Sequence, residues 1–381
     1  MAPVTIHGVL RLVVPLASCA AALLGAAWLL SRARSGRRRS GVLGAVLALG
    51  LVLTLIVGAP TALGGTRARL TPAPPSAMWI VHEVHSGPGY AGIGRLRIPA
   101  FPASLRTSTL RRPSSPPEHG IVGSVVIPSS RSHFTARPAL VYLPPAARVP
   151  QPRLLPVIVA FSGQSRGAGP RDLEVSGHLQ ALMDRIAAKH DGVAPIVVVP
   201  GQLGPASGNP MCVDSNRFGR VATYVIHDVR HWILGRLPSD VARRRWTVAG
   251  FSEGGTCAIQ FAAAHPDLFG SVVDVSGENA PANGDLAHTI AVGFAGNRAA
   301  YLRATPAWVL AHHRYVDEEA YFAAGALDHT YGPVAPVMAR RAAAAGMTTH
   351  RTTIPNLAHN WRMADAGFRW AFTRLTSRWK L

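Results

Sequence analysis

One serine stands in a setting that suits covalent chemistry, in the pentapeptide Gly250-Phe251-Ser252-Glu253-Gly254. The apolar run Trp246–Ala249 precedes it and the small-residue run Gly255–Ala264 follows it, which predicts a strand, a sharp turn and a helix. A Gly-x-Ser-x-Gly sequence between a strand and a helix is typical of a nucleophile elbow, a strained turn that presents the serine hydroxyl to a substrate carbonyl. The pattern predicts acyl transfer through Ser252.

A second match to the same pattern is Gly163-Gln164-Ser165-Arg166-Gly167, after the predicted strand Leu155–Phe161. It runs into Gly169-Pro170, which is poorly suited to starting a helix tightly. The context therefore favours Ser252 as the nucleophile.

A serine nucleophile needs a histidine base, and the histidine needs a carboxylate that steers it. Asp328 follows the predicted strand Ala320–Ala324, and His359 follows the predicted strand Thr348–Ile354. The carboxyl ends of parallel strands meet at one edge of a sheet, and the order Ser, Asp, His suits such a site. We predict a triad of Ser252, Asp328 and His359.

Two further acids remain as alternatives to Asp328, namely Asp274 inside an apolar strand and Glu278 just after it. Of the other histidines, His312 and His313 fit better as surface residues and His265 as the end of a helix, whereas His329 is too close to Asp328 in sequence to face it across a site. None of these groups has the spacing of metal ligands, so no metal and no cofactor is predicted.

The oxyanion of the reaction needs backbone N–H donors. We predict one from Glu253 and another from the loop that contains Gly163 and Gln164, where Gly163 permits a close approach. The Glu253 carboxylate would disfavour a nearby oxyanion unless it points away or is paired. The favoured expectation is that it leans to solvent or onto an arginine, and the alternative is that it holds a cationic substrate group.

The composition is strongly basic, with a formal net charge of +20 in 381 residues. The arginines are scattered along the chain instead of being clustered among aromatic residues, so nucleic-acid binding is not predicted. Attraction to anionic lipid or wall polymer is the expected consequence of this charge.

Two apolar stretches, Leu12–Leu30 and Gly41–Ala59, are long enough to cross a bilayer as helices. The arginine-rich loop 31–40 between them is predicted to stay in the cytoplasm, which places the rest of the chain outside. An alternative takes Arg37–Ala62 as a signal peptide. Both interpretations export the catalytic domain, and the first localises it to the cell membrane.

Cys212 and Cys257 both lie in the part predicted to be exported. A disulfide between them is one interpretation, and two small buried apolar side chains are the other.

The chain is predicted to contain a membrane anchor over 1–62, a linker with an irregular segment over 63–119, and a catalytic domain over 120–381. Strands and helices alternate from residue 154, which predicts an α/β fold with a parallel, doubly wound sheet preceded by antiparallel strands. The predicted strands are Trp79–Val84, Ile121–Ile127, Thr135–Leu143, Leu155–Phe161, Ala194–Val199, Trp246–Ala249, Ser271–Val275, Ala320–Ala324 and Thr348–Ile354. The predicted helices are Asp172–Lys189, Arg220–Leu234, Gly255–Ala264, Val334–Ala345 and Ala364–Thr376, and 86–119 is predicted to be a loop.

The elbow and three other segments resemble the esterase family of the α/β-hydrolase superfamily, which includes esterase D and the mycolyltransferases. Those segments are Val141-Tyr142-Leu143-Pro144-Pro145, His265-Pro266-Asp267-Leu268-Phe269 and Ala358-His359-Asn360-Trp361. The resemblance covers about residues 120–370 and implies an α/β-hydrolase fold with Ser252 as nucleophile, Asp328 as acid and His359 as base. Because the family acts on varied esters, the resemblance does not indicate a substrate.

We therefore expect a membrane-anchored, extracytoplasmic serine esterase that cleaves a carboxylic ester of a lipid or cell-envelope component through an acyl-enzyme. The alternative is an acyltransferase of mycolyltransferase type, which passes the acyl group to a sugar hydroxyl. A wall-binding module with a decayed site is a third interpretation, and the complete Ser, Asp, His set argues against it. The sequence does not specify an oligomeric state.

Overall fold

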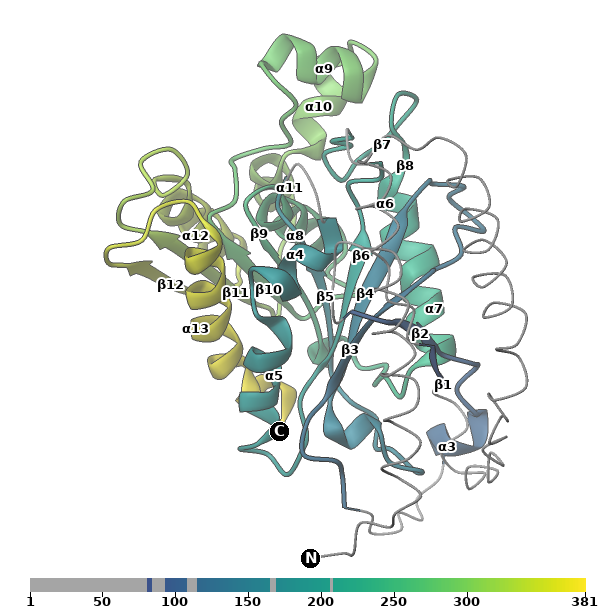
Figure 1. Cartoon of the computed structure of the whole chain (residues 1–381). Helices are drawn as coiled ribbons and strands as arrows, with labels where there is room; N and C mark the ends of the chain where they lie inside the picture. The colour runs from purple at the N-terminus through teal and green to yellow at the C-terminus, as the bar shows by residue number, and fades with distance from the viewer. Residues whose placement is uncertain (1–80, 84–92, 108–114, 165–168, 206–207) are drawn as a thin grey trace, which may run out of the picture. The chain divides into compact units, whose positions relative to one another are not determined.

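The computed structural model describes residues 81–83, 93–107, 115–164, 169–205 and 208–381, which belong to one compact unit that spans residues 72–381. Ten of the described strands form one sheet, in the order β1-β2-β3-β4-β6-β5-β9-β10-β11-β12 (Figure 1). Their bounds are β1 Val81–Glu83, β2 Arg95–Arg97, β3 Ile121–Val125, β4 Arg137–Leu143, β5 Val157–Phe161, β6 Ile196–Gly201, β9 Trp246–Phe251, β10 Ser271–Val275, β11 Glu319–Gly325 and β12 Thr348–Ile354. A separate hairpin pairs β7 Asp214–Ser215 with β8 Gly219–Arg220.

The sheet has the predicted division into a parallel part and an antiparallel part. All neighbours from β6 through β12 pair in parallel, whereas β3 with β4 and β4 with β6 pair antiparallel. The central strands β5, β6, β9 and β10 are buried along their whole length. This burial explains why their sequences are continuous apolar runs instead of alternating patterns.

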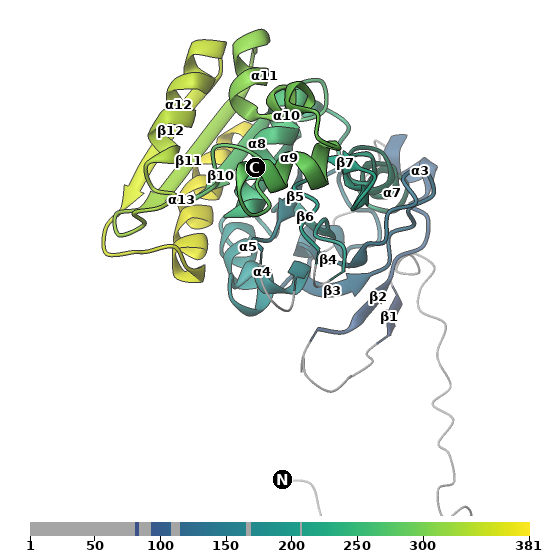
Figure 2. The ribbon, with the colours of Figure 1, turned by 90° about the horizontal axis from the view of Figure 1, so that it is seen from above.

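Helices cover both faces of the sheet (Figure 2). Val157, Val159 and Phe161 of β5 belong to an apolar cluster with α7, α8, α11 and α12, and Ile158 and Ala160 belong to a second cluster with α5 and α13. The helices are α3 Ala103–Thr107, α4 Asp172–Val175, α5 Leu179–Ala187, α6 Val221–Thr223, the π-helical turn η4 Tyr224–Val229, α7 Arg230–Arg236, α8 Glu253–Ala264, α9 Leu286–Phe294, α10 Arg298–Ala304, α11 Pro306–His312, α12 Val334–Ala345 and α13 Trp361–Trp379.

The predicted strands from Ile121 onward are all present, with ends that differ by at most a few residues. Two predicted helices are interrupted. The helix predicted over Asp172–Lys189 divides into α4 and α5 at Gly177 and His178, where His178 has a left-handed backbone. The helix predicted over Arg220–Leu234 contains the π-helical turn η4 between α6 and α7.

Some elements were missed because they are short. The predicted loop 86–119 contains β2 and α3 among its described residues, and the connection from β10 to β11 contains α9, α10 and α11. Helices of seven to nine residues are too short for a clear helical period. Each of the three begins at a polar residue whose side chain caps the helix, namely Asp285, Asn297 and Thr305.

The prediction of two transmembrane helices is corrected. In the part of the chain that the structure describes, no helix combines the length and apolar character needed to cross a bilayer. Even α13, with 19 residues, carries charged side chains such as Asp365 and Arg369. The predicted spans Leu12–Leu30 and Gly41–Ala59 lie outside the described residues. The fold class that the described residues support is the α/β-hydrolase fold.

Candidate active site

Ser252 occupies the sharp turn between β9 and α8. Its backbone has φ 59° and ψ −125°, a conformation that is strained for a residue with a side chain. Neighbouring glycines make the turn possible, because a β-carbon on Gly250 would collide with the Gly254 carbonyl and one on Gly254 would collide with the Phe161 carbonyl. The predicted elbow is thus present at Ser252, whereas the alternative Ser165 lies outside the described residues.

The three residues of the predicted triad lie within hydrogen-bond distance of one another. The Ser252 Oγ is 2.8 Å from Nε2 of His359, and Nδ1 of His359 is 2.9 Å from Oδ2 of Asp328. Asp328 and His359 come from the loops after β11 and β12, at the edge of the sheet where β9 ends. An Nδ1–H that donates to Asp328 leaves Nε2 as the acceptor that faces the serine hydroxyl.

The site holds Asp328 in its charged form. Burial opposes the charge, but hydrogen bonds from the Tyr331 N–H and from His359 outweigh burial and keep the pKa of Asp328 below its usual value. The Asp328 side chain is 1% exposed, whereas that of His359 is 26% exposed. The carboxylate is thus shielded from solvent while the imidazole can reach a substrate.

Aromatic rings fix the orientation of the His359 imidazole. The Phe251 ring stacks on it at 4.9 Å between centroids, and the Tyr331 ring packs against it at 4.4 Å. The next residue, Asn360, caps the start of α13 by accepting a hydrogen bond from the Met363 N–H. Tyr331 was not among the predicted site residues, although an N–H three residues after an aspartate is a common partner of the aspartate side chain.

The structure pairs His359 with Asp328 and not with the alternative acids. Asp274 is buried on β10, where its Oδ1 accepts a hydrogen bond from the Gly277 N–H at 2.9 Å. Burial raises its pKa to about 7, and burial also raises the pKa of Glu278. Of the remaining histidines, His265 ends α8 as expected, and His312, His313 and His329 are exposed.

The predicted oxyanion donors lie beside the elbow. Gly163 is buried against it, since a β-carbon there would come within 3.0 Å of the Phe251 carbonyl and 3.1 Å of the Ser252 β-carbon. Gln164 is exposed, and Glu253 is the first residue of α8, so its N–H is one of the free donors of that helix. The oxyanion role of Gly163, Gln164 and Glu253 stays a prediction.

The expectation for the Glu253 side chain was wrong, because it neither leans to solvent nor pairs with an arginine. The residue is 5% exposed, and its Oε1 lies 3.0 Å from Sγ of Cys257. Cys257 and Cys212 form a disulfide, with their Cα atoms 5.5 Å apart. Burial, followed by repulsion from Glu278, raises the pKa of Glu253 to about 8 although the Gln202 side chain opposes the shift.

Within the described ranges, the group of side chains compact enough to hold a metal ion is Cys212, Glu253 and Cys257. The sulfurs of Cys212 and Cys257 are bonded to each other, whereas metal binding by cysteine needs free thiolates. This group is therefore not a metal site while the disulfide is intact.

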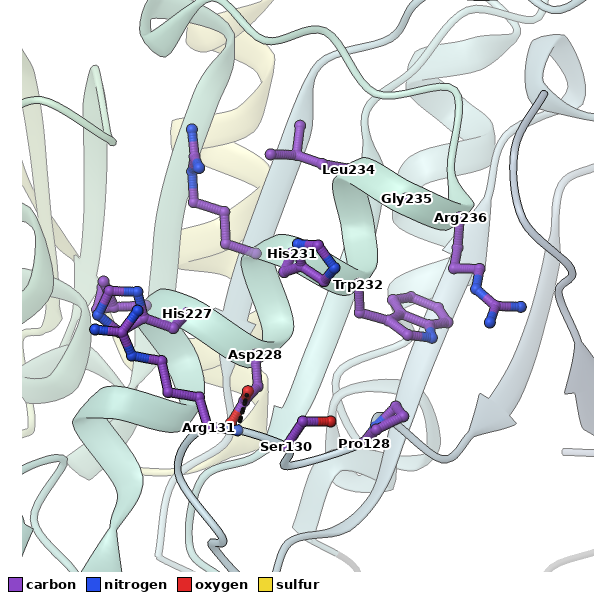
Figure 3. A pocket seen from close by; sticks show the side chains of 12 residues that line it. Pro128, Ser130, Arg131, His227, Asp228, His231, Trp232, Leu234, Gly235 and Arg236 are labelled. Atoms are coloured by element: carbon purple, nitrogen blue, oxygen red, sulfur yellow. Dashed lines mark hydrogen bonds between the residues drawn. The ribbon is translucent and has the colours of Figure 1, made fainter. Parts of the chain in front are cut away.

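A hollow of about 590 Å³ lies elsewhere, between the β3–β4 connection and the segment η4–α7 (Figure 3). Its lining includes the basic or histidine side chains Arg131, His227, Arg230, His231 and Arg236. No residue of the predicted triad or of the predicted oxyanion donors lines it. It is therefore separate from the candidate esterase site.

Comparison with known proteins identifies a family. Residues 130–355 match the family described as putative esterase. An uncharacterized protein of Corynebacterium glutamicum is 34% identical over 255 residues, which are 64% of this chain and 59% of that protein. The chain thus spans less than two thirds of the length of this curated relative.

Solved structures show the same fold. An S-formylglutathione hydrolase from Agrobacterium tumefaciens superposes with a TM-score of 0.57 at 17% identity, over 69% of this chain and 97% of that one. A ferulic acid esterase gives 0.54 at 16% identity, over 68% and 97%. A fluorophosphonate-binding serine hydrolase of Staphylococcus aureus gives 0.53 at 16% identity, over 68% and 98%. At such low identity the likeness establishes the fold alone.

Proposed function

The chain belongs to the putative esterase family, and from this premise we propose that it is a carboxylic ester hydrolase that works through an acyl-enzyme on Ser252. The observation that carries the proposal is the continuous contact from Ser252 through His359 to Asp328 at a strained elbow. The same three residues were expected from their positions, each on a loop after its own strand.

In the proposed first step His359 accepts the Ser252 proton while Oγ attacks the ester carbonyl. Asp328 stays ionised and stabilises the imidazolium that forms. The negative oxygen of the intermediate accepts hydrogen bonds from the Glu253 N–H and from the loop at Gly163 and Gln164. His359 then protonates the leaving alcohol, and the same base activates the water that releases the acid.

We further propose that the catalytic domain works outside the cytoplasm on an ester of the cell envelope. The Cys212–Cys257 disulfide supports export, because such bonds persist in oxidising compartments. The net charge of +20 supports attraction to anionic envelope polymers or lipids.

The test is incubation of the purified protein with envelope lipid extract, with and without a sugar acceptor, followed by mass spectrometry of products and of intact protein. Hydrolysis predicts free acid in both samples and a covalent adduct on the Ser252 peptide. Predominant transfer of the acyl group to the sugar would instead establish the acyltransferase alternative. An unchanged yield from Ser252→Ala would refute the acyl-enzyme on Ser252.

A further inference from the structure

A carboxyl group directly after the nucleophile lies buried where the reaction requires positive potential. Glu253 is the first residue of α8 and is 5% exposed, and its own N–H is a proposed donor to the oxyanion. Helix N-termini favour negative charge on a ligand because their free N–H groups carry partial positive charge. An ionised Glu253 side chain would offset that potential.

The atoms that contact the Glu253 carboxyl carry no charge. Oε1 lies 3.0 Å from Sγ of Cys257 and 3.8 Å from Sγ of Cys212, and disulfide sulfurs carry no proton to donate. Oε2 is buried without a hydrogen-bond partner among the described residues. No ion pair within the described ranges includes Glu253.

The Gln202 side chain connects Glu253 to the oxyanion loop. Gln202 is 1% exposed, and it lies close enough to the Glu253 carboxyl to lower the pKa of that group. Its Nε2 also donates to the Ser162 carbonyl at 2.7 Å, and Ser162 directly precedes Gly163. The amide of Gln202 therefore lies between the residue after the nucleophile and the loop opposite it.

We propose, resting on the proposed function, that Glu253 is a positioning residue that stays uncharged in the working enzyme and braces the Ser162–Gln164 loop through Gln202. The disulfide forms the wall that keeps water away from the carboxyl. Ionisation of Glu253 places a negative charge beside the site of the oxyanion, and it slows acyl transfer without removing any residue of the triad.

The titratable groups near Glu253 influence the pH at which its carboxyl ionises. Glu278 acts on Glu253 by repulsion, and burial with this repulsion raises the pKa of Glu253 to about 8. Asp274 is buried on β10 with a pKa raised to about 7, and His359 is hydrogen-bonded to Ser252. The uncharged form of Glu253 is present below its pKa, so kcat is expected to fall as the pH rises through about 8.

The experiment measures kcat and KM of the full chain for p-nitrophenyl acetate from pH 6 to 9.5, corrected for uncatalysed hydrolysis. Glu253→Gln keeps a neutral group that can accept from Gln202, so the alkaline fall should disappear while kcat at pH 7 stays within about threefold. Glu253→Ala should lower kcat about 10- to 100-fold with a smaller change in KM, because the loop loses its brace. Glu278→Gln should move the midpoint of the alkaline fall to lower pH.

Two controls separate this proposal from others. Glu118→Gln alters a side chain that is 88% exposed, and it should leave kcat and the alkaline fall as in the wild type. Asp274→Asn tests the other buried acid and should also leave the alkaline fall in place. Thermal melting of each variant establishes that it is folded.

An alkaline fall that persists in folded Glu253→Gln with its wild-type midpoint would overturn the role of Glu253. Turnover by Ser252→Ala at any pH would instead overturn the proposed function. The two failures are therefore distinguishable in one set of measurements.

Discussion

Gly163 lies so close to Ser252 that a β-carbon on Gly163 would come within 3.1 Å of the Ser252 β-carbon. The loop after β5 therefore approaches the nucleophile closely, and it also lies against Gly254 at the start of α8. This approach is what a site needs if backbone N–H groups are to converge on one oxygen atom of a substrate.

Substitution of Gly163 tests this approach. In Gly163→Ala the added methyl group meets the Phe251 carbonyl of a buried strand, so the loop must shift. We expect kcat for p-nitrophenyl acetate to fall about 10- to 100-fold with the protein still folded. Gly235→Ala is the matched control, because nothing lies within 4 Å of its β-carbon position. Wild-type turnover in Gly163→Ala would contradict the oxyanion assignment.

The two Gly-x-Ser-x-Gly matches predict different outcomes with a covalent probe. A fluorophosphonate should label the wild type and Ser165→Ala, because the hydroxyl that contacts His359 belongs to Ser252. Ser252→Ala should not be labelled. The measurement is in-gel fluorescence, with circular dichroism to verify folding. Loss of labelling in folded Ser165→Ala would reverse the assignment.

The choice of acid is tested by amide substitutions. Asp328→Asn removes the charge that stabilises the imidazolium and should lower kcat by about 10⁴-fold, as in other enzymes with such a triad. Asp274→Asn should keep most activity, because Asp274 accepts its hydrogen bond from Gly277. A larger loss in Asp274→Asn than in Asp328→Asn, measured by steady-state kinetics, would exchange the two roles.

The triad could be predicted from the sequence because each of its residues follows a predicted strand. Strand order and the direction of parallel pairing then bring Ser252, Asp328 and His359 to one edge. The alternative acid Asp274 could not be excluded in this way, since it lies in a strand of the same sheet. Only the fold shows that its carboxyl turns to the Gly277 N–H.

The environment of Glu253 could not be predicted, because it depends on a segment far away in the chain. Cys212 lies 45 residues before Cys257 and helps to cover the carboxyl. No sequence pattern around the elbow indicates that Cys212 covers the Glu253 carboxyl. The short helices α9 to α11 were missed for a different reason. They are too short to show a hydrophobic period, and only their N-cap residues mark where they begin.

The disulfide should contribute strongly to stability. Cys212 lies in the segment between β6 and β7, and Cys257 lies in α8, so the bond ties a long connection to the helix that follows the nucleophile. With a separation of 45 residues, closure of the loop in the unfolded chain predicts about 4 kcal/mol of stabilisation. Both cysteines are buried, so reduction of the native protein is expected to be slow.

Alkylation tests whether the bond forms, and denaturation tests its effect. Intact mass of the protein alkylated after denaturation should show two more labelled thiols with a reductant than without it, while Cys19 contributes equally to both samples. The double variant Cys212→Ala/Cys257→Ala should unfold at a lower guanidinium concentration, with a free energy of unfolding lower by about 4 kcal/mol. Variant Cys19→Ala is the control and should unfold like the wild type. Equal labelling with and without reductant would rule out the bond, and with it the wall that shields Glu253.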